Sequence, residues 1–475
     1  MSNKSSKPAI DTIDPLNSEA CRRARMARDP RFDGEFFIGV TSTGIYCRPI
    51  CPARQPAEKN VKYFRHAAQA AETGFRPCLR CRPETAPNSP AWLGSATTLQ
   101  RALDLIRAGA LNGDNNLQQL ADRLGIGERY LRKLFQRELG VSPLAVAQNQ
   151  RLLLAKQLLL ETQLPLTEIA FAAGFGSVRR FNSAIQSAFG MPPSAMRRRR
   201  LSSTHSDRIE LELHYRPPYD WDGVNAVFAR HAVEGVEQVT ANCYSLRFAL
   251  SGQTGKLSVR PLKNKHALSL TVQLSKMTPL MPIIERVRRM FDLDANPDVI
   301  AQHLSQDPTL ATLIPRYPGI RSPVKWSPEE AAIRAIVGQQ VSTLAARSIC
   351  ARLAQTVQPD EEKRTFPTAA AIALLDDEYF PMPGRRRETL QSLEAKAFRN
   401  GELCTEAFAA AKGIGPWTTA MLAMRGYGDP DAFPETDLGL LQAWEKLNPA
   451  EKLKQANKRW APWRTYAANL LWRTL

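Results

Sequence analysis

Two close pairs of cysteines in the first hundred residues restrict the fold of this chain more than any other feature. Cys47 and Cys51 are separated by three residues, Cys78 and Cys81 by two, and 26 residues lie between the pairs. A loop that brings the pairs together can complete a tetrahedral shell of four sulfur atoms, which favours zinc over harder cations. The spacing therefore predicts a small α+β domain built around one zinc ion.

The charge of the chain points to a polyanionic partner. The 475 residues carry a formal net charge of +18, and the positive excess is concentrated in the first 200 residues. Such a distribution is typical of nucleic-acid binding, although a basic surface can also serve solubility alone. The sequence has no apolar run of about 18 residues and begins without the apolar core of a signal peptide. We therefore expect a cytoplasmic protein without a membrane span.

The length exceeds what one hydrophobic core supports, and segments rich in proline and polar residues divide the chain into four predicted domains. Breaks occur at RPETAPNSP, at MRRRRLSSTHSD and around the prolines near residue 280. The domains predicted from these breaks cover residues 1–86, 92–200, 207–278 and 279–475.

The segments around the cysteines, TSTGIYCRPICPAR and GFRPCLRC, resemble the Ada family of alkylation-response regulators. The resemblance implies repair of methylphosphotriesters by methyl transfer to a zinc-bound cysteine, and it assigns the acceptor to Cys47, which makes the zinc both structural and catalytic. The chemistry is suitable because zinc keeps a cysteine in its nucleophilic thiolate form. Arg48 and Arg76 lie beside the cysteines and would hold DNA phosphate. The alternative is that zinc only folds the domain.

The second segment carries two helix-turn-helix patterns. Residues 117–138 form an apolar helical face, break at Gly125 and resume as a basic helix, and a helix over about 143–161 leads to a second copy. The region 97–198, above all GFGSVRRFNSAIQSAFGMPPS, resembles AraC-type activators, which implies promoter DNA and RNA polymerase as partners. The side chains expected in the major groove are Arg129, Arg132, Arg179, Arg180 and Asn182. They can read base edges or contact phosphate only.

The remaining sequence changes from strands to helices. Residues 208–275 alternate apolar and polar positions, which predicts four or five antiparallel strands, with a helix near 223–233. The stretch HYRPPYDWDGV resembles the N-terminal domain of AlkA-type 3-methyladenine DNA glycosylases, and the resemblance continues to residue 475. It implies an α+β sheet domain followed by an all-α helix-hairpin-helix glycosylase domain.

The most informative motif of this half is AAKGIGPWTTAMLAMRG. Gly413 and Gly415 predict a turn between two helices whose backbone N–H groups hold DNA phosphate, although such turns also occur without that role. In the resembled family, hairpin carbonyls can also bind a monovalent cation. Asp437 falls where the family has its catalytic aspartate, which stabilises the positive charge on the sugar as the glycosidic bond breaks. By itself, it would be an ordinary helix cap.

The resemblance also places the base pocket. Trp417 and Trp472 match pocket aromatics, which favour a cationic alkylpurine through stacking and cation–π attraction. Two positions depart from the family: Met421 replaces a pocket tyrosine, and Gln340 replaces the leucine that is wedged into the duplex. Trp417 also occupies the position of the Schiff-base lysine of bifunctional glycosylases, so we expect base excision without strand cleavage.

The sequence therefore predicts a multidomain, mainly α-helical fusion of an Ada-type methyl acceptor, an AraC-type DNA-binding domain and an AlkA-type glycosylase. Its expected partners are alkylated double-stranded DNA and promoter DNA, and we expect a monomer in the bacterial cytosol. The alternative is a transcription regulator whose glycosylase-like half senses damage without excising bases.

Overall fold

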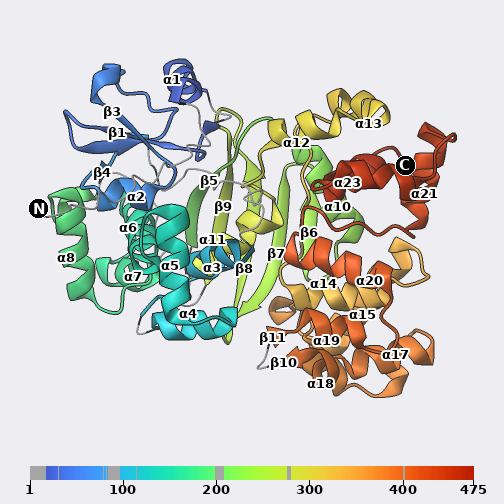
Figure 1. Cartoon of the computed structure of the whole chain (residues 1–475). Coiled ribbons are helices and arrows are strands. Elements are labelled where there is room, and N and C mark those ends of the chain that lie inside the picture. Colours follow the sequence, from blue (N-terminus) through green and yellow to red (C-terminus); the bar gives the residue numbers. More distant parts are fainter. Residues whose placement is uncertain are drawn as a thin grey trace, which may run out of the picture.

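A computed structural model describes residues 18–29, 32–78, 80–81, 83, 97–113, 115–197, 208–274, 280–399 and 402–475. A five-stranded sheet lies in the middle of the molecule (Figure 1). The cysteine-containing module and the helix-turn-helix module lie on one side of it, and most of the C-terminal helices lie on the other. This arrangement confirms the mixed, mainly helical multidomain fold. The predicted domain borders fall on residues outside the described part of the chain.

The N-terminal module is a small sheet with two helices packed on it. Its strand order is β3-β1-β2-β4; β1 pairs antiparallel with β2 and β3, whereas β2 and β4 are parallel. Its elements are α1 (Ser18–Ala27), β1 (Phe37–Val40), β2 (Ile45–Cys47), β3 (Val61–Phe64), α2 (Ala67–Glu72) and β4 (Arg76–Pro77).

Local signals define both helix-turn-helix units. Helix α4 begins at Asn116, whose side chain forms a capping box with Gln119, and ends at Gly125 with φ of 70°. Helix α8 begins at the cap Ser177 and ends at Gly190 with φ of 71°. The helices are α3 (Thr97–Arg107), α4 (Leu117–Leu124), α5 (Glu128–Leu139), α6 (Pro143–Glu161), α7 (Leu166–Ala172), α8 (Val178–Phe189) and α9 (Pro193–Met196). The helix predicted over 143–161 is confirmed as α6.

The central sheet has the antiparallel strand order β5-β9-β8-β7-β6. Its elements are β5 (Arg208–His214), α10 (Trp221–His231), β6 (Glu237–Thr240), β7 (Cys243–Leu250), β8 (Gln253–Pro261) and β9 (Ala267–Leu274). Strands β5 and β7 bury alternate side chains, as period-two patterning requires, whereas β9 buries nearly all of its side chains. The predicted strands and the helix near 223–233 are therefore confirmed.

The C-terminal helices are divided between two hydrophobic cores. One core is continuous with the central sheet and contains Ile336 of α14 and Leu422 of α20. The other contains Leu440 of α21 and Leu470 of α23. The elements are α11 (Leu280–Met290), α12 (Pro297–Leu304), α13 (Pro308–Leu313), α14 (Pro328–Val337), α15 (Thr343–Val357), α16 (Ala369–Ala373), α17 (Gly384–Gln391), α18 (Leu393–Ala397), β10 (Phe398–Arg399), β11 (Glu402–Leu403), α19 (Thr405–Ala410), α20 (Pro416–Leu422), α21 (Leu438–Leu447), α22 (Leu453–Ala456) and α23 (Arg464–Trp472).

Buried polar contacts join the modules. Lys156 of α6 is fully buried, and its Nζ donates to the Cys78 carbonyl at 2.7 Å. Arg216, which follows β5 and is also fully buried, pairs with Glu35 of the N-terminal module at 3.3 Å. Such contacts leave little freedom for the modules to move apart, because separation would leave buried charges without their partners.

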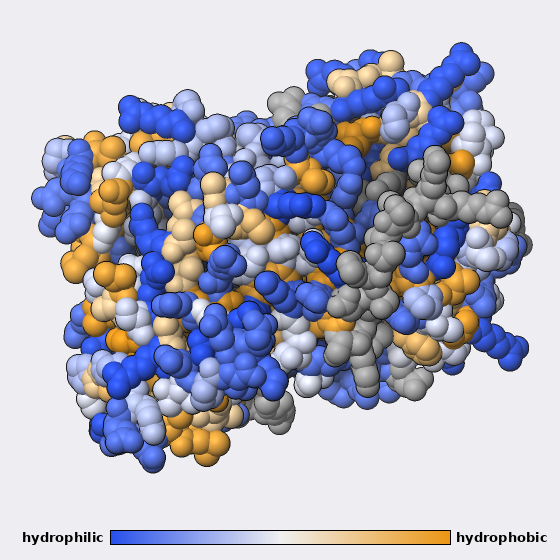
Figure 2. Space-filling model, turned by 180° about the vertical axis from the view of Figure 1, so that it is seen from behind, coloured by the Kyte–Doolittle hydropathy of each residue, from blue (hydrophilic) through white to orange (hydrophobic). Residues whose placement is uncertain are grey.

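The outer surface is largely polar on the face shown in Figure 2, where orange apolar patches are scattered among blue hydrophilic residues. Within the described ranges, no helix combines the length and apolar character that crossing a bilayer requires.

Candidate metal centre and catalytic pocket

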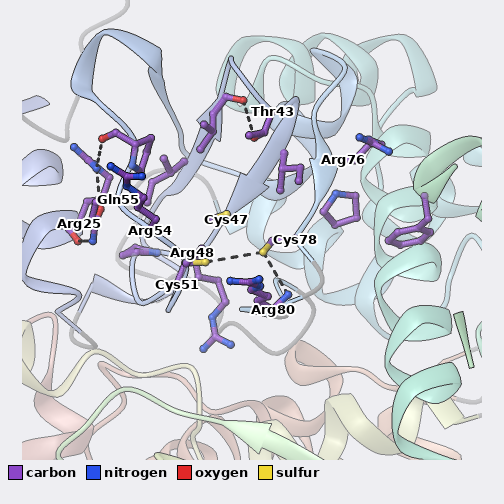
Figure 3. A pocket seen from close by; sticks show the side chains of 18 of the residues that line it. Arg25, Thr43, Cys47, Arg48, Cys51, Arg54, Gln55, Arg76, Cys78 and Arg80 are labelled. Carbon is purple, nitrogen blue, oxygen red and sulfur yellow. Dashed lines mark hydrogen bonds between the residues drawn. The ribbon is translucent and has the colours of Figure 1, made fainter. Parts of the chain in front are cut away.

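The four cysteines converge beside the N-terminal sheet. Cys47 ends β2 and Cys78 follows β4, and the parallel pairing of these strands brings the two residues together. All four Sγ atoms lie within 4.8 Å of one another, and those of Cys51 and Cys78 are 3.9 Å apart (Figure 3). This compact set is the geometry that a tetrahedral zinc site requires.

Crowding of the thiols supports a metal at this position. Hydrogen bonding to Cys51 and Cys78 raises the pKa of Cys47, and hydrogen bonding to Cys47 lowers the pKa of Cys78. Four thiolates at such short separations repel one another, so they coexist only when a cation compensates their charge. The donor set therefore fits Zn²⁺ with all four cysteines as ligands.

Hydrogen bonds distinguish Cys47 from the other three cysteines. Backbone N–H groups donate to each of those three: Arg48 to Cys81 at 3.3 Å, Arg80 to Cys78 at 3.4 Å, and Ala53 to Cys51. Within the described part of the chain, no backbone N–H donates to Cys47. Because a donor withdraws electron density from sulfur, Cys47 keeps the most nucleophilic sulfur of the set.

A cavity of about 360 Å³ opens beside Cys47. Its lining includes the exposed side chains of Arg54, Arg76 and Arg80, which would attract an anionic phosphate (Figure 3). Phe189 at the end of α8 also lines it. The cysteine site thus shares its cavity with the second helix-turn-helix unit.

Arg48 requires a correction to the sequence prediction. Its side chain is only 2% exposed, and its Nε donates to Asp33 Oδ1 at 2.8 Å while its Nη1 donates to the Cys81 carbonyl at 3.0 Å. A guanidinium buried against a carboxylate contacts phosphate only after that pair is broken. The expected DNA contact by Arg48 is therefore wrong for this arrangement, in which Arg48 fixes the loop that carries Cys81.

The side chains expected in the major groove lie on the second helix of each unit, α5 or α8. All are exposed: Arg129, Arg132, Arg179, Arg180 and Asn182. Arg132 donates to Glu128 at 2.9 Å, an exposed pair one helical turn apart that DNA can readily displace. The arrangement offers two basic helix faces; direct reading of bases by these side chains stays a prediction.

Gly413 and Gly415 are placed between α19 and α20, as predicted, but for different physical reasons. Gly413 has φ of 93°, and a Cβ there would lie 2.4 Å from Thr389 Oγ1. Gly415 has φ of −109°, and a Cβ there would meet nothing within 4 Å. Gly413 is thus required by the fold, whereas Gly415 leaves free space at the start of α20. The Gly413 carbonyl accepts a hydrogen bond from Gln339 Nε2 at 2.9 Å, so a monovalent cation would share this oxygen.

Asp437 is held by three hydrogen bonds. It caps α21, and its Oδ1 accepts from Leu440 N at 3.0 Å. The Trp472 indole N–H donates to Oδ1 and the Trp417 indole N–H donates to Oδ2, each at 3.0 Å. Three donors around the carboxylate fix its orientation.

These groups line a cavity of about 450 Å³ between the two hydrophobic cores of the C-terminal helices. Met421 lines the same cavity. Gln340 does not line it; it is exposed in the turn between α14 and α15, with φ of 55°. Trp463, a third tryptophan near the C-terminus, is 4% exposed and belongs to the second core.

Sequence reasoning missed two cations of this cavity, the buried Lys325 and the partly buried Arg425. The Arg425 guanidinium lies 5.3 Å from the centre of the Trp472 ring, and burial lowers its pKa to about 10. A single charge inside the apolar run MLAMRGY was the available signal for Arg425. Lys325 lies in a loop, where lysines are common, so no sequence signal distinguished it.

The chain aligns over nearly its whole length with a protein of Mycobacterium tuberculosis (strain H37Rv), the probable bifunctional transcriptional activator/DNA repair enzyme AlkA. The two are 38% identical over 481 residues, which covers 96% of each chain. The chain belongs to this AlkA-type bifunctional family. Three family descriptions match in order: the metal binding domain of Ada (20–84), a helix-turn-helix domain (120–199) and the AlkA N-terminal domain (210–327). The predicted Ada/AraC–AlkA fusion is therefore confirmed.

Two Escherichia coli proteins correspond to different parts of this AlkA-type fusion. DNA-3-methyladenine glycosylase 2 is 29% identical over 55% of this chain and 96% of its own length. The bifunctional transcriptional activator/DNA repair enzyme Ada is 33% identical over 36% of this chain and 47% of its own length. The fusion thus combines about half of an Ada-type protein with nearly all of an AlkA-type glycosylase.

Proposed function

We propose that this protein repairs alkylated DNA at two chemically distinct sites and regulates transcription of the alkylation response. One site excises alkylated purines such as 3-methyladenine, and the other accepts methyl groups from methylphosphotriesters. The main support is the position of Asp437, a carboxylate fixed by two indole donors at the wall of a cavity large enough for a purine.

In the excision reaction, a flipped alkylpurine enters the cavity with its sugar beside Asp437. Alkylation gives the base a positive charge, so it leaves without strong acid assistance when the glycosidic bond breaks. The Asp437 carboxylate stabilises the positive charge that develops on the sugar and orients the attacking water. The faces of Trp417 and Trp472 bind the charged base, while their N–H groups hold the carboxylate.

The product of this site is an abasic strand with an intact backbone. Trp417 occupies the position of the lysine on which a covalent imine route depends, and its indole nitrogen donates to Asp437 instead of acting as a nucleophile. Purified protein should release free 3-methyladenine from methylated DNA and leave strands that break only after alkali treatment. A protein adduct trapped by borohydride would contradict the monofunctional assignment. Tight binding without base release would favour a damage-sensing regulator.

In the methyl-transfer reaction, the Cys47 sulfur attacks the methyl carbon of a phosphotriester. An S–C bond forms, the C–O bond breaks, and the phosphodiester anion leaves. Zinc supplies the thiolate at neutral pH. Arg54, Arg76 and Arg80 would hold the phosphate, and the absence of a backbone donor to Cys47 among the described residues supports its selection as the acceptor.

Mass spectrometry tests the acceptor. After incubation with methylphosphotriester DNA, a peptide that contains Cys47 should gain the mass of one methyl group, with at most one equivalent per chain. Cys47→Ala should abolish the gain, whereas the control Cys243→Ser, on β7 of the central sheet, should retain it. A zinc-replete wild-type protein that gains no methyl group would leave zinc with a folding role only.

The two helix-turn-helix units are proposed to bind adjacent turns of promoter DNA through α5 and α8. Recruitment of RNA polymerase, the monomeric state and residence in the bacterial cytosol stay predictions. So does a cation at the hairpin. Footprinting on the chain's own promoter would test the first step: protection should cover two major-groove segments about one helical turn apart.

A further inference from the structure

A buried lysine faces the cavity that contains Asp437. Lys325 lies just before α14 and is 9% exposed. Its backbone N–H donates to the Arg425 carbonyl at 2.8 Å, which fixes its position, and its Nζ lies 5.6 Å from the centre of the Phe228 ring. Within the described chain, no hydrogen-bond acceptor contacts Nζ. A buried polar group of this kind is normally satisfied, so its position in a cavity indicates a bound partner.

A chain of contacts links the groups of the cavity. Asp437 accepts from Trp472, whose ring lies under the Arg425 guanidinium. Arg425 is bonded through its backbone to Lys325, and Phe228 lies beyond. Asp437 and Lys325 therefore line the same cavity and are linked through Trp472 and Arg425. When the sugar-bearing N9 of a flipped purine lies near Asp437, its opposite edge, with N1 and the 6-substituent, can face Lys325 across this cavity.

The other cations of this wall have little unused capacity to donate. Arg425 donates to the Pro323 carbonyl and to Asn469 Oδ1, each at 2.9 Å. Arg334 is engaged by two carboxylates, Glu237 at 2.6 Å and Glu330 at 2.7 Å. Of these three cations, Lys325 is the one whose side-chain nitrogen has no hydrogen-bond partner within the described chain.

We propose that Lys325 determines which bases are excised, by donating a hydrogen bond to the 6-oxygen of a flipped 6-oxopurine. This inference rests on the proposed base excision. A 6-oxygen accepts from an ammonium, whereas the 6-amino group of an adenine lesion donates and so opposes it. A neutral 6-oxopurine such as hypoxanthine also avoids the repulsion between Lys325 and a cationic base. Lys325 therefore favours hypoxanthine over 3-methyladenine, the reverse of what the aromatic walls favour.

The charge of Lys325 makes this preference depend on pH. Burial lowers the pKa of Lys325 to about 8, an effect that Arg334 and Arg425 reinforce and Glu237 and Glu330 oppose. Two further titratable groups face it: His231, whose pKa burial lowers far enough to keep it neutral, and Cys350, whose pKa burial raises to about 11. Between pH 6.5 and 9, Lys325 is therefore the group of this cluster that changes charge, and the preference should decline as pH rises through about 8.

Single-turnover excision from duplexes that contain hypoxanthine or 3-methyladenine tests the inference. The full chain is compared with Lys325→Met, with Lys325→Gln and with Lys263→Met, a control at an exposed lysine. Lys325→Met should lower the ratio of hypoxanthine to 3-methyladenine excision about tenfold or more at pH 7, the effect of one charged donor. The same ratio for Lys325→Met, measured across the pH range, shows how much of the pH dependence comes from titration of hypoxanthine itself. Lys325→Gln keeps a neutral donor, so it should retain part of the preference but lose the pH dependence due to Lys325.

The outcomes separate this inference from the excision on which it rests. A Lys325→Met ratio within about twofold of wild type across the pH range overturns the role of Lys325, even when both bases are released. Failure of the wild-type protein to release either base overturns base excision instead. If Lys325→Met does not fold, the Lys325→Gln profile decides, since a ratio and pH dependence equal to wild type overturn the inference.

Discussion

Asp437 loses its charge but nearly keeps its shape when it is replaced by asparagine. The Leu440 N–H and the Trp472 indole can still donate to the remaining oxygen. Asp437→Asn should slow base excision by at least about 100-fold, because the charge on the sugar is no longer stabilised. Affinity for abasic-site DNA should change less than about threefold, since the hairpin is untouched. Single-turnover excision and a binding titration measure the two effects; comparable excision by the variant would overturn the catalytic assignment.

The residues of both sites could be predicted from sequence only where the signal is local or carried by family resemblance. The four cysteines and the cap position of Asp437 are visible in the chain itself. The Trp472 donor to Asp437 comes from 35 residues away, and the Asp33 partner that buries Arg48 comes from 15 residues away. Such partners depend on packing that no local pattern encodes.

At the scale of elements, the hairpin offers a matched pair of substitutions. Gly413→Ala should lower the free energy of unfolding by about 2 kcal/mol or more, because its positive φ and the close Thr389 both oppose a Cβ. Gly415→Ala should change stability by less than about 0.5 kcal/mol, since its φ is ordinary and its surroundings are open. Chemical denaturation followed by tryptophan fluorescence measures both.

The same pair tests contact between the hairpin and DNA. A methyl group at Gly415 would stand between the backbone and a phosphate, so Gly415→Ala should weaken binding to abasic-site DNA several-fold while leaving the fold intact. If this variant binds as tightly as wild type, the hairpin is not a DNA contact.

Elements were predictable where their ends carry strong signals. Helix α6 matched its predicted span because Ser142 caps it and Pro143 occupies its first turn. The strands followed from period-two alternation, although the sequence could not choose between four and five. Nothing local indicated that the second helix-turn-helix unit and the central sheet contribute to one continuous core, since the apolar faces of separate segments do not specify which face packs on which.

At the scale of the whole molecule, the cavity shared by Cys47 and the end of α8 suggests how methylation alters promoter binding. Conversion of one thiolate to a thioether removes one negative charge from the metal site. Weaker repulsion of phosphate is worth about 1 to 2 kcal/mol after screening, so methylated protein should bind a promoter fragment roughly tenfold more tightly. The difference should shrink as salt rises. Equal affinities at low salt would leave Cys47 with a repair role only.

The buried pair between Glu35 and Arg216 predicts that the modules unfold together. Burial lowers the pKa of Arg216, and the charge of Glu35 opposes this shift. Glu35→Gln should therefore destabilise the protein by about 2 to 3 kcal/mol and separate one calorimetric transition into two. The control Glu72→Gln, at an exposed residue of α2, should leave a single transition. An unchanged single transition for Glu35→Gln would show that this pair does not couple the modules.

The packing of the cysteine module against the glycosylase half, through Glu35 and Arg216, has a consequence for the working life of each molecule. A methyl acceptor of the proposed kind reacts once, whereas a glycosylase turns over. Because the two are packed together, a copy that has used its cysteine keeps a functioning excision site. Methylated copies gathered at a promoter would raise the local concentration of glycosylase there. The regulatory DNA that sets the response would then be the most closely surveyed stretch of the genome.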